Sequence, residues 1–297
     1  MIELLGSFVW YQAKAHISKV FERGGPETYT PRPCAMELPQ ELFEEIFIHV
    51  QLDTPTLKAC SLTCRSWYIA ILPHLHHTLT LIGRISNPAH DKLEPLQQLN
   101  EMGLHPLVRR LRILRNPLLE FWFSPRIFNA RSLAYFSAFT NVQELGIDGL
   151  DLEAFVPQAQ LYFGQFTSAL RYLALKTPNG DYHLLLHFLG LFPNLDDLKL
   201  IYYGALQSQS SPPALASITN SVPSLRGRLT LTSFRGEGFL KELSKLSGGF
   251  RFRSVDLCGA DGTRFILDSC ADTLETLRIR YPVGPPGEGW PFSEVFI

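Results

Sequence analysis

The residues that could carry chemistry in this 297-residue chain include five cysteines and nine histidines. Cys60 and Cys64 lie four positions apart, which places both thiols on one face of a helix, and His74, His76 and His77 follow them. Thiolate and imidazole are ligands that zinc prefers, but structural zinc needs four ligands in compact pairs, and these histidines crowd a presumed turn. We therefore interpret the two cysteines as small core residues and expect no metal.

Other catalytic chemistry has little support in the spacing of the residues. Cys258 or Cys270 could act as a nucleophile only beside a base, and the sequence indicates none. Asp196 and Asp197 are spaced like solvated residues, not like an acid–base pair. The Gly-x-x-x-x-Gly-Lys-Ser/Thr, Gly-x-Gly-x-x-Gly, His-Glu-x-x-His and Gly-x-Ser-x-Gly motifs do not occur. An enzyme within the later part of the chain stays an alternative, whose signature would be a converging set of Cys, His and carboxylate side chains.

The composition narrows the classes of partner. The chain is 45% hydrophobic and 19% charged, which is ordinary for a folded protein with a sizeable core. With 27 basic and 28 acidic residues the net charge is −1, so we expect neither nucleic acid nor an anionic membrane as a partner. No apolar run approaches the ~20 residues that span a bilayer. The odd, small number of cysteines indicates no disulfide framework, which favours a cytoplasmic or nuclear setting, and no cofactor is expected.

A short helical unit is predicted over residues 36–81. Apolar residues at helical spacing form one stripe along residues 37–51. A second helix is predicted from Asp53, a polar capping residue that a proline follows two positions later. A third runs through residues 65–70 and is expected to stop near Pro73. Three short helices bury little apolar surface by themselves, so we expect this unit to share its core with a partner.

This unit resembles the F-box motif, in the form common in large fungal families. The resemblance rests on Leu-Pro-x-Glu-Leu at 38–42, Ile-Phe-x-x-Val at 46–50 and the run from Leu57 to Trp67, in which Thr63 replaces the usual apolar residue. In that family the unit docks on the Skp adaptor of Skp–cullin–F-box ubiquitin ligases. The resemblance implies that six residues form the interface or support it directly: Leu38, Pro39, Leu42, Ile46, Leu57 and Trp67. An ordinary amphipathic three-helix cap without a partner is the alternative.

After this unit, the pattern apolar-x-x-apolar-x-apolar recurs along the chain and predicts a series of strands. The copies begin at Val108, Val142, Leu170, Leu195, Phe252 and Leu274, with a strained copy at Leu225 and an entry copy at His76. Consecutive regular copies are spaced by 34, 28, 25 and 22 residues, which brackets the ~20–29-residue period of leucine-rich repeats. Helix-like segments lie between them, at 184–192, 215–222, 239–246 and 265–271.

The array therefore resembles degenerate leucine-rich repeats, in which the usual asparagine is absent. The resemblance implies an α/β protein in which the helical unit is followed by a curved solenoid over residues 82–281. A two-layer α/β domain with similar strands is the alternative. Side chains that alternate with the buried leucines would face a partner. The candidates for binding a substrate are Glu144, Asp148, Tyr172, Lys176, Asp197, Lys199, Arg278 and Arg280, and the same face is expected to carry Arg110, Arg112, Arg228, Asp256 and Thr276. A merely solvated sheet face is equally compatible with this pattern.

The ends of the chain complete the predicted organisation. Residues 1–35 are expected to be a poorly ordered extension, with Met36 a possible true start, and residues 282–297 a tail rich in proline and glycine. The combination predicts a non-catalytic adaptor that links a Skp subunit, and through it a cullin, to a target protein for ubiquitination. A protein-binding scaffold that works without a cullin is the second hypothesis.

Overall fold

The computed structural model describes ten stretches of the chain. These are residues 40–50, 53–63, 65–83, 94–115, 130–176, 181–201, 225–246, 250–260, 262–282 and 292–296. The chain divides into two compact units, Met1–Ala70 and Ile71–Ile297. The expected extension at 1–35 and the possible start at Met36 lie outside the described residues.

The first unit contains short helices at the predicted places. They are α2 (Gln40–Val50), α3 (Thr54–Ser61) and the start of α4 (Arg65–His76). The Asp53 carboxylate caps α3, because its Oδ1 accepts a hydrogen bond from the Thr56 backbone N–H at 3.2 Å. Pro55 lies in the first turn of α3, where its missing N–H costs nothing.

The expected stop near Pro73 is wrong. The helix α4 continues through Pro73 to His76, into the second unit. A proline inside a helix removes one backbone hydrogen bond and crowds the preceding turn. Ile71, two residues earlier, is fully buried, and tertiary packing of this kind outweighs local propensity in holding a helix together.

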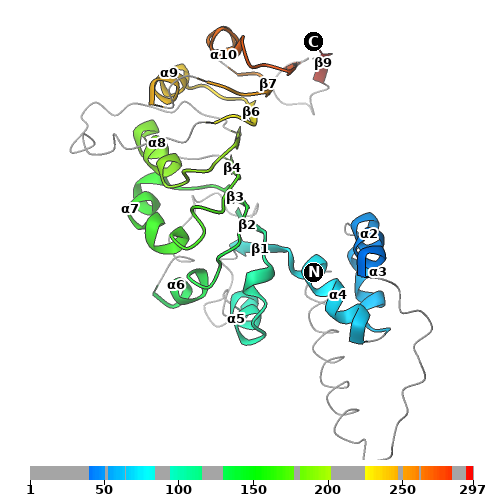
Figure 1. The fold of residues 1–297 in the computed structure, drawn as a ribbon. Helices are drawn as coiled ribbons and strands as arrows, with labels where there is room; N and C mark the ends of the chain where they lie inside the picture. Colours follow the sequence, from blue (N-terminus) through cyan, green and yellow to red (C-terminus); the bar gives the residue numbers. More distant parts are fainter. Residues whose placement is uncertain are drawn as a thin grey trace, which may run out of the picture. The chain divides into compact units, whose positions relative to one another are not determined.

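The second unit is built on one sheet of nine strands in chain order (Figure 1). The strands are β1 (Thr78–Gly83), β2 (Arg110–Arg115), β3 (Glu144–Asp148), β4 (Tyr172–Lys176), β5 (Asp197–Ile201), β6 (Arg228–Thr232), β7 (Ser254–Cys258), β8 (Thr276–Pro282) and β9 (Phe292–Phe296). Strands β1 to β8 are parallel, each paired with the next along the chain. Each of the eight predicted strand patterns coincides with one of them.

The register of the strands explains why the apolar pattern repeats. Two ladders of aliphatic side chains cross the sheet, because equivalent positions of neighbouring strands pair directly. One ladder runs through Leu111, Leu145, Leu173, Leu198, Leu229 and Val255, and the other through Ile113, Ile147, Leu175, Leu200, Leu231 and Leu257. All twelve are buried, at 2% exposure or less. The side chains between them point to the opposite face, as the two-residue period of a strand requires.

Helices connect the parallel strands and bury the ladders. They are α5 (Glu94–Glu101), α6 (Ala130–Phe136), α7 (Leu152–Phe163), α8 (Tyr182–Gly190), α9 (Glu237–Leu246) and α10 (Thr263–Cys270), and a 3₁₀ turn, η1 (His105–Leu107), precedes β2. In Figure 1, α6 to α9 gather on one side of the strands. Their buried side chains share one core with the ladders. Helices α8, α9 and α10 match three predicted segments, and the fourth, 215–222, lies outside the described residues.

A cluster of aromatic rings fills the middle of this core. The ring of Phe163 lies 5.4 Å from that of Phe155, 5.3 Å from Phe166, 6.1 Å from Phe136 and 6.3 Å from Phe188, measured between centroids. Phe163 has no exposed surface. These rings come from helices α6, α7 and α8 and from the turn after α7. They therefore join successive strand–helix repeats of the second unit, which we call the array.

The last strand changes direction. β9 runs antiparallel to β8 and pairs with its whole length, from Arg278 with Phe296 to Pro282 with Phe292. It lies within the range for which a tail was expected, and it covers the edge that β8 would otherwise expose. Among the described residues, no helix combines the length and the apolar character needed to cross a membrane.

Candidate protein-binding surfaces

Two of the six predicted partner-binding residues lie on the surface of α2. Leu42 is 49% exposed and Ile46 is 42% exposed. They are four positions apart, which places them one above the other on the same face of the helix. Large apolar side chains at this exposure gain free energy when another surface removes them from water.

Two other candidates pack inside the helical unit. Leu57 on α3 is 1% exposed, as is Phe47 on α2. The half-buried Trp67 ring meets the Phe47 ring edge to face, with centroids 5.8 Å apart. Leu57 and Trp67 therefore hold the helices together and support the exposed residues from within. The remaining two candidates, Leu38 and Pro39, lie outside the described residues.

Two further apolar residues, outside the predicted set, are also exposed in this unit. Leu62, which follows α3, is 60% exposed, and Ile69 on α4 is 56% exposed. Five large apolar side chains are exposed in the part of the chain that the structure describes, and four of them lie in the first unit. We call Leu42, Ile46, Leu62 and Ile69 the exposed apolar set. The sequence could have indicated the exposure of Leu62 and Ile69, since both are apolar residues in a helical unit too small to bury all of its apolar side chains.

The second surface is the face of the sheet opposite the buried ladders, which we call the open face. All eight predicted substrate-binding residues occupy it, and none belongs to the buried core. Six of them lie on the adjacent strands β3, β4 and β5, where Glu144 pairs with Tyr172, and Tyr172 with Asp197. Arg278 and Arg280 lie three strands further on, on β8.

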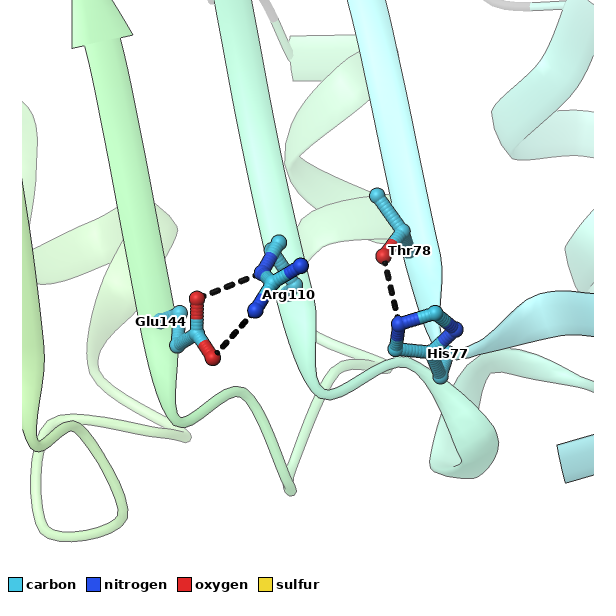
Figure 2. A network of polar contacts seen from close by, with 4 residues as sticks. All are labelled: His77, Thr78, Arg110 and Glu144. Carbon is cyan, nitrogen blue, oxygen red and sulfur yellow. Dashed lines mark hydrogen bonds and ion pairs between the residues drawn. The ribbon is translucent and has the colours of Figure 1, made fainter. Parts of the chain in front are cut away.

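Ion pairs join neighbouring strands across the open face. The Arg110 guanidinium binds both carboxylate oxygens of Glu144, with Nη2 2.7 Å from Oε1 (Figure 2). Hydrogen bonding to the Glu144 carboxylate raises the pKa of Arg110 above its ordinary value. Beside them, the ring of His77 meets the Thr78 hydroxyl at 3.0 Å.

Two further pairs repeat this arrangement at other strands. Lys176 Nζ lies 2.9 Å from Asp148 Oδ2, and Arg280 Nη2 lies 2.9 and 3.0 Å from the two oxygens of Asp256. Each pair joins adjacent strands, β3 with β4 and β7 with β8, so it supports the parallel register as well as the surface.

Tyr172 lies among charged residues near the centre of this face. Burial raises the pKa of its phenol, and the negative charges of Glu144 and Asp197 raise it further, against smaller opposing effects of Arg112 and Arg110. The hydroxyl therefore stays protonated near neutral pH and can donate a hydrogen bond to an acceptor.

Asp197 has a structural role beside its place on the surface. Its Oδ1 accepts a hydrogen bond from the Arg228 backbone N–H at 2.6 Å, which ties the start of β6 to β5. A Cβ at Gly227 would lie 2.0 Å from the same oxygen, so only glycine fits there without a shift.

The described residues offer little for covalent chemistry. Burial raises the pKa of the Cys258 and Cys270 thiols, which disfavours the reactive thiolate. Within the described stretches, no three His, Cys, Asp or Glu side chains are grouped so that they could hold a metal ion. Cys64 of the Cys60–Cys64 pair lies outside them.

Comparison with known proteins agrees with the sequence pattern of the first unit. No curated protein matches the chain. A family model, described as F-box-like, matches residues 35–82. This range contains α2, α3 and α4 and nearly all of β1, and therefore the whole exposed apolar set. The chain carries an F-box-like domain at residues 35–82, which indicates a role in protein–protein interaction.

Proposed function

We propose that this protein is the substrate-recognition adaptor of a Skp–cullin–F-box ubiquitin ligase. In this proposal the F-box-like domain binds the Skp subunit, and the open face of the sheet holds a target protein. Other subunits carry out ubiquitin transfer, and the adaptor acts by proximity, since holding target and ubiquitin carrier together raises their effective concentration. The site of action would be the cytoplasm or nucleus.

The observation that carries this proposal is the concentration of exposed apolar side chains in the F-box-like domain. Leu42, Ile46, Leu62 and Ile69 are 42% to 60% exposed, while the large array exposes Leu161 alone among the large apolar side chains of its described residues. A partner that covers Leu42 and Ile46 would need an interface on the order of 1,600 Å² in total. Leu38 and Pro39 remain proposed members of this interface.

The array is proposed to be a solenoid of degenerate leucine-rich repeats. Its support is the sequential order of eight parallel strands, each aligned with the next by two ladders of aliphatic side chains. Such units bury their apolar faces against one another, and their polar strand face stays available to a target. Glu144, Tyr172, Lys199 and Arg278 would be among the contacts.

Affinity capture with mass spectrometry tests the proposal. The tagged full chain is expected to capture both a Skp subunit and a cullin, whereas the chain with Leu42→Asp and Ile46→Asp captures neither. The matched control is Leu161→Asp, which changes a leucine of 63% exposure on α7. Capture of a Skp subunit without any cullin would favour the cullin-independent scaffold. Full capture by the Leu42→Asp, Ile46→Asp chain would contradict the proposed interface.

A further inference from the structure

The charge of the open face differs from that of the whole chain. At the positions that alternate with the ladders in β1 to β8, seven residues are basic and four are acidic. The basic ones are Arg110, Arg112, Lys176, Lys199, Arg228, Arg278 and Arg280, and the acidic ones are Glu144, Asp148, Asp197 and Asp256. The face therefore carries three net positive charges, against a net charge of −1 for the chain.

Every acidic residue on this face already has a partner within the sheet. Glu144, Asp148 and Asp256 form ion pairs with Arg110, Lys176 and Arg280, and Asp197 accepts the Arg228 N–H. These carboxylates are therefore less available to a cationic ligand. The net positive charge of the open face therefore lies on basic residues outside these three ion pairs.

The side chains of Arg112, Lys199 and Arg228 form no ion pair with any residue in the described part of the chain. Arg112 and Arg228 are exposed and Lys199 is half-buried. An unpaired cation on a surface gains most from an anionic ligand, because no internal ion pair must be broken first.

Arg112 and Lys199 belong to one row across the sheet, with small residues between them. Direct pairing runs from Arg112 to Gly146, from Gly146 to Ala174 and from Ala174 to Lys199. Three strand spacings separate the two cations, which is roughly 14 Å at the backbone. Glycine and alanine offer no bulk that would keep a ligand away from the row. The protonated Tyr172 hydroxyl lies on β4, one of the two strands between the cations.

We propose that the open face binds a peptide segment with anionic side chains, which lies across β2 to β5 and meets Arg112 and Lys199. This proposal rests on the proposed function in one respect, since the segment would belong to the target protein. The shared chemistry is a carboxylate or phosphate group on the peptide. Anions about four residues apart in an extended peptide would match the distance between the two cations.

Fluorescence anisotropy with the full chain and labelled peptides of about twelve residues, long enough to cross the sheet, tests this proposal. The probes are alternating Ser-Glu, Ser-Gln and phosphoserine-Gln peptides and a single-stranded oligonucleotide of equal length. Either anionic peptide is expected to bind, and its Kd should rise several-fold between about 50 and about 300 mM salt. The anionic peptide that binds more tightly, Ser-Glu or phosphoserine-Gln, shows whether the face prefers a carboxylate or a phosphate group. Equal binding of the Ser-Gln peptide, or tighter binding of the oligonucleotide, would overturn the proposal.

Charge-reversed variants locate the site. Arg112→Glu with Lys199→Glu should weaken peptide binding about tenfold. Lys245→Glu with Arg264→Glu makes the same change of net charge on the helices α9 and α10 and should change the Kd less than about twofold. Arg112→Gln with Lys199→Gln provides a milder variant if the reversed one unfolds. An equal loss in the helix variant would contradict the location.

The same samples separate this proposal from the proposed function. Leu42→Asp with Ile46→Asp should lose capture of the Skp subunit and keep peptide binding. Arg112→Glu with Lys199→Glu should show the opposite result. If the parent chain captures a Skp subunit but binds no anionic peptide, only the proposal of an anionic peptide ligand is contradicted. If it binds the peptide but captures no Skp subunit, only the adaptor role is contradicted.

Discussion

The F-box-like domain and the array differ in how completely they bury their large apolar side chains. In the array, two ladders and a cluster of phenylalanines are almost completely buried, and polar residues, some of them joined in ion pairs, lie on the other face of the sheet. In the F-box-like domain, Phe47 and Leu57 are buried, but Leu42, Ile46, Leu62 and Ile69 remain exposed. The difference shows that the array completes its own core, whereas the small domain has apolar surface to offer to a partner.

The largest effect is expected in the core of the array. Phe163→Ala removes a fully buried ring in contact with rings of several elements, so the free energy of unfolding of the array should fall by about 4 kcal/mol. Leu161→Ala, on the same helix but 63% exposed, should change it by less than about 0.5 kcal/mol. Urea unfolding followed by circular dichroism measures both. Similar losses in the two variants would contradict the described core.

The second effect separates core from surface within the F-box-like domain. Leu57→Ala should destabilise this domain by about 3 kcal/mol, because Leu57 is 1% exposed. Leu42→Ala should cost about 0.5 kcal/mol, since half of its surface is already in water. Hydrogen exchange of the α2 and α3 amides reports the local stability of this domain. Equal exchange in the two variants would remove the distinction between supporting and exposed residues.

The third effect concerns the ion pairs of the open face. The Arg280 and Asp256 side chains are 23% and 20% exposed and meet through both carboxylate oxygens, so their coupling should be about 1 kcal/mol. The pair Lys245–Glu242 on α9 is 70% and 36% exposed and should give about 0.3 kcal/mol. Double-mutant cycles with Arg280→Gln and Asp256→Asn, and with the equivalent changes on α9, measure both couplings. Equal couplings would show that the open-face pairs are ordinary surface contacts.

The smallest effect is a pH dependence in the F-box-like domain. Hydrogen bonds from the Thr56 side chain and backbone hold the pKa of Asp53 below its ordinary value of 3.8. The cap therefore stabilises α3 fully above that ordinary value and is lost as the pH falls through the lower, folded-state pKa. An NMR titration of the Thr56 amide should follow this loss. Asp53→Asn keeps an oxygen acceptor and should make the amide shift independent of pH in that range, and a titration that persists would assign it to another group.

The strands of the array were predictable because their signal is local. An aliphatic residue at every second position, such as Leu173 and Leu175, identifies a strand with one buried face, and each repeat of the pattern gave a strand of the sheet. Helices α5, α6 and α7 were missed. Pro157 lies inside α7 and breaks the pattern on which a sequence-based prediction relies, while the packing of Phe155 and Phe163 holds that helix together.

The surfaces were less accessible to sequence reasoning. Leu42 and Leu57 are both leucines at helical spacing, and only the packing of the helices shows that one is exposed and the other buried. Arg110 and Glu144 are 34 residues apart, so their ion pair depends on the register of two strands and not on a sequence motif. Local pattern therefore gives the elements and the face of each residue, while contacts between elements require the structure.

In the proposed function, the exposed apolar residues of α2, Leu42 and Ile46, bind a Skp subunit. Isothermal titration calorimetry of the full chain with a purified Skp subunit tests it directly. We expect Leu42→Asp with Ile46→Asp to weaken binding by about a hundredfold or more, and Leu161→Asp to bind like the parent chain. Unchanged affinity in the double variant, at an unchanged melting temperature, would contradict the claim.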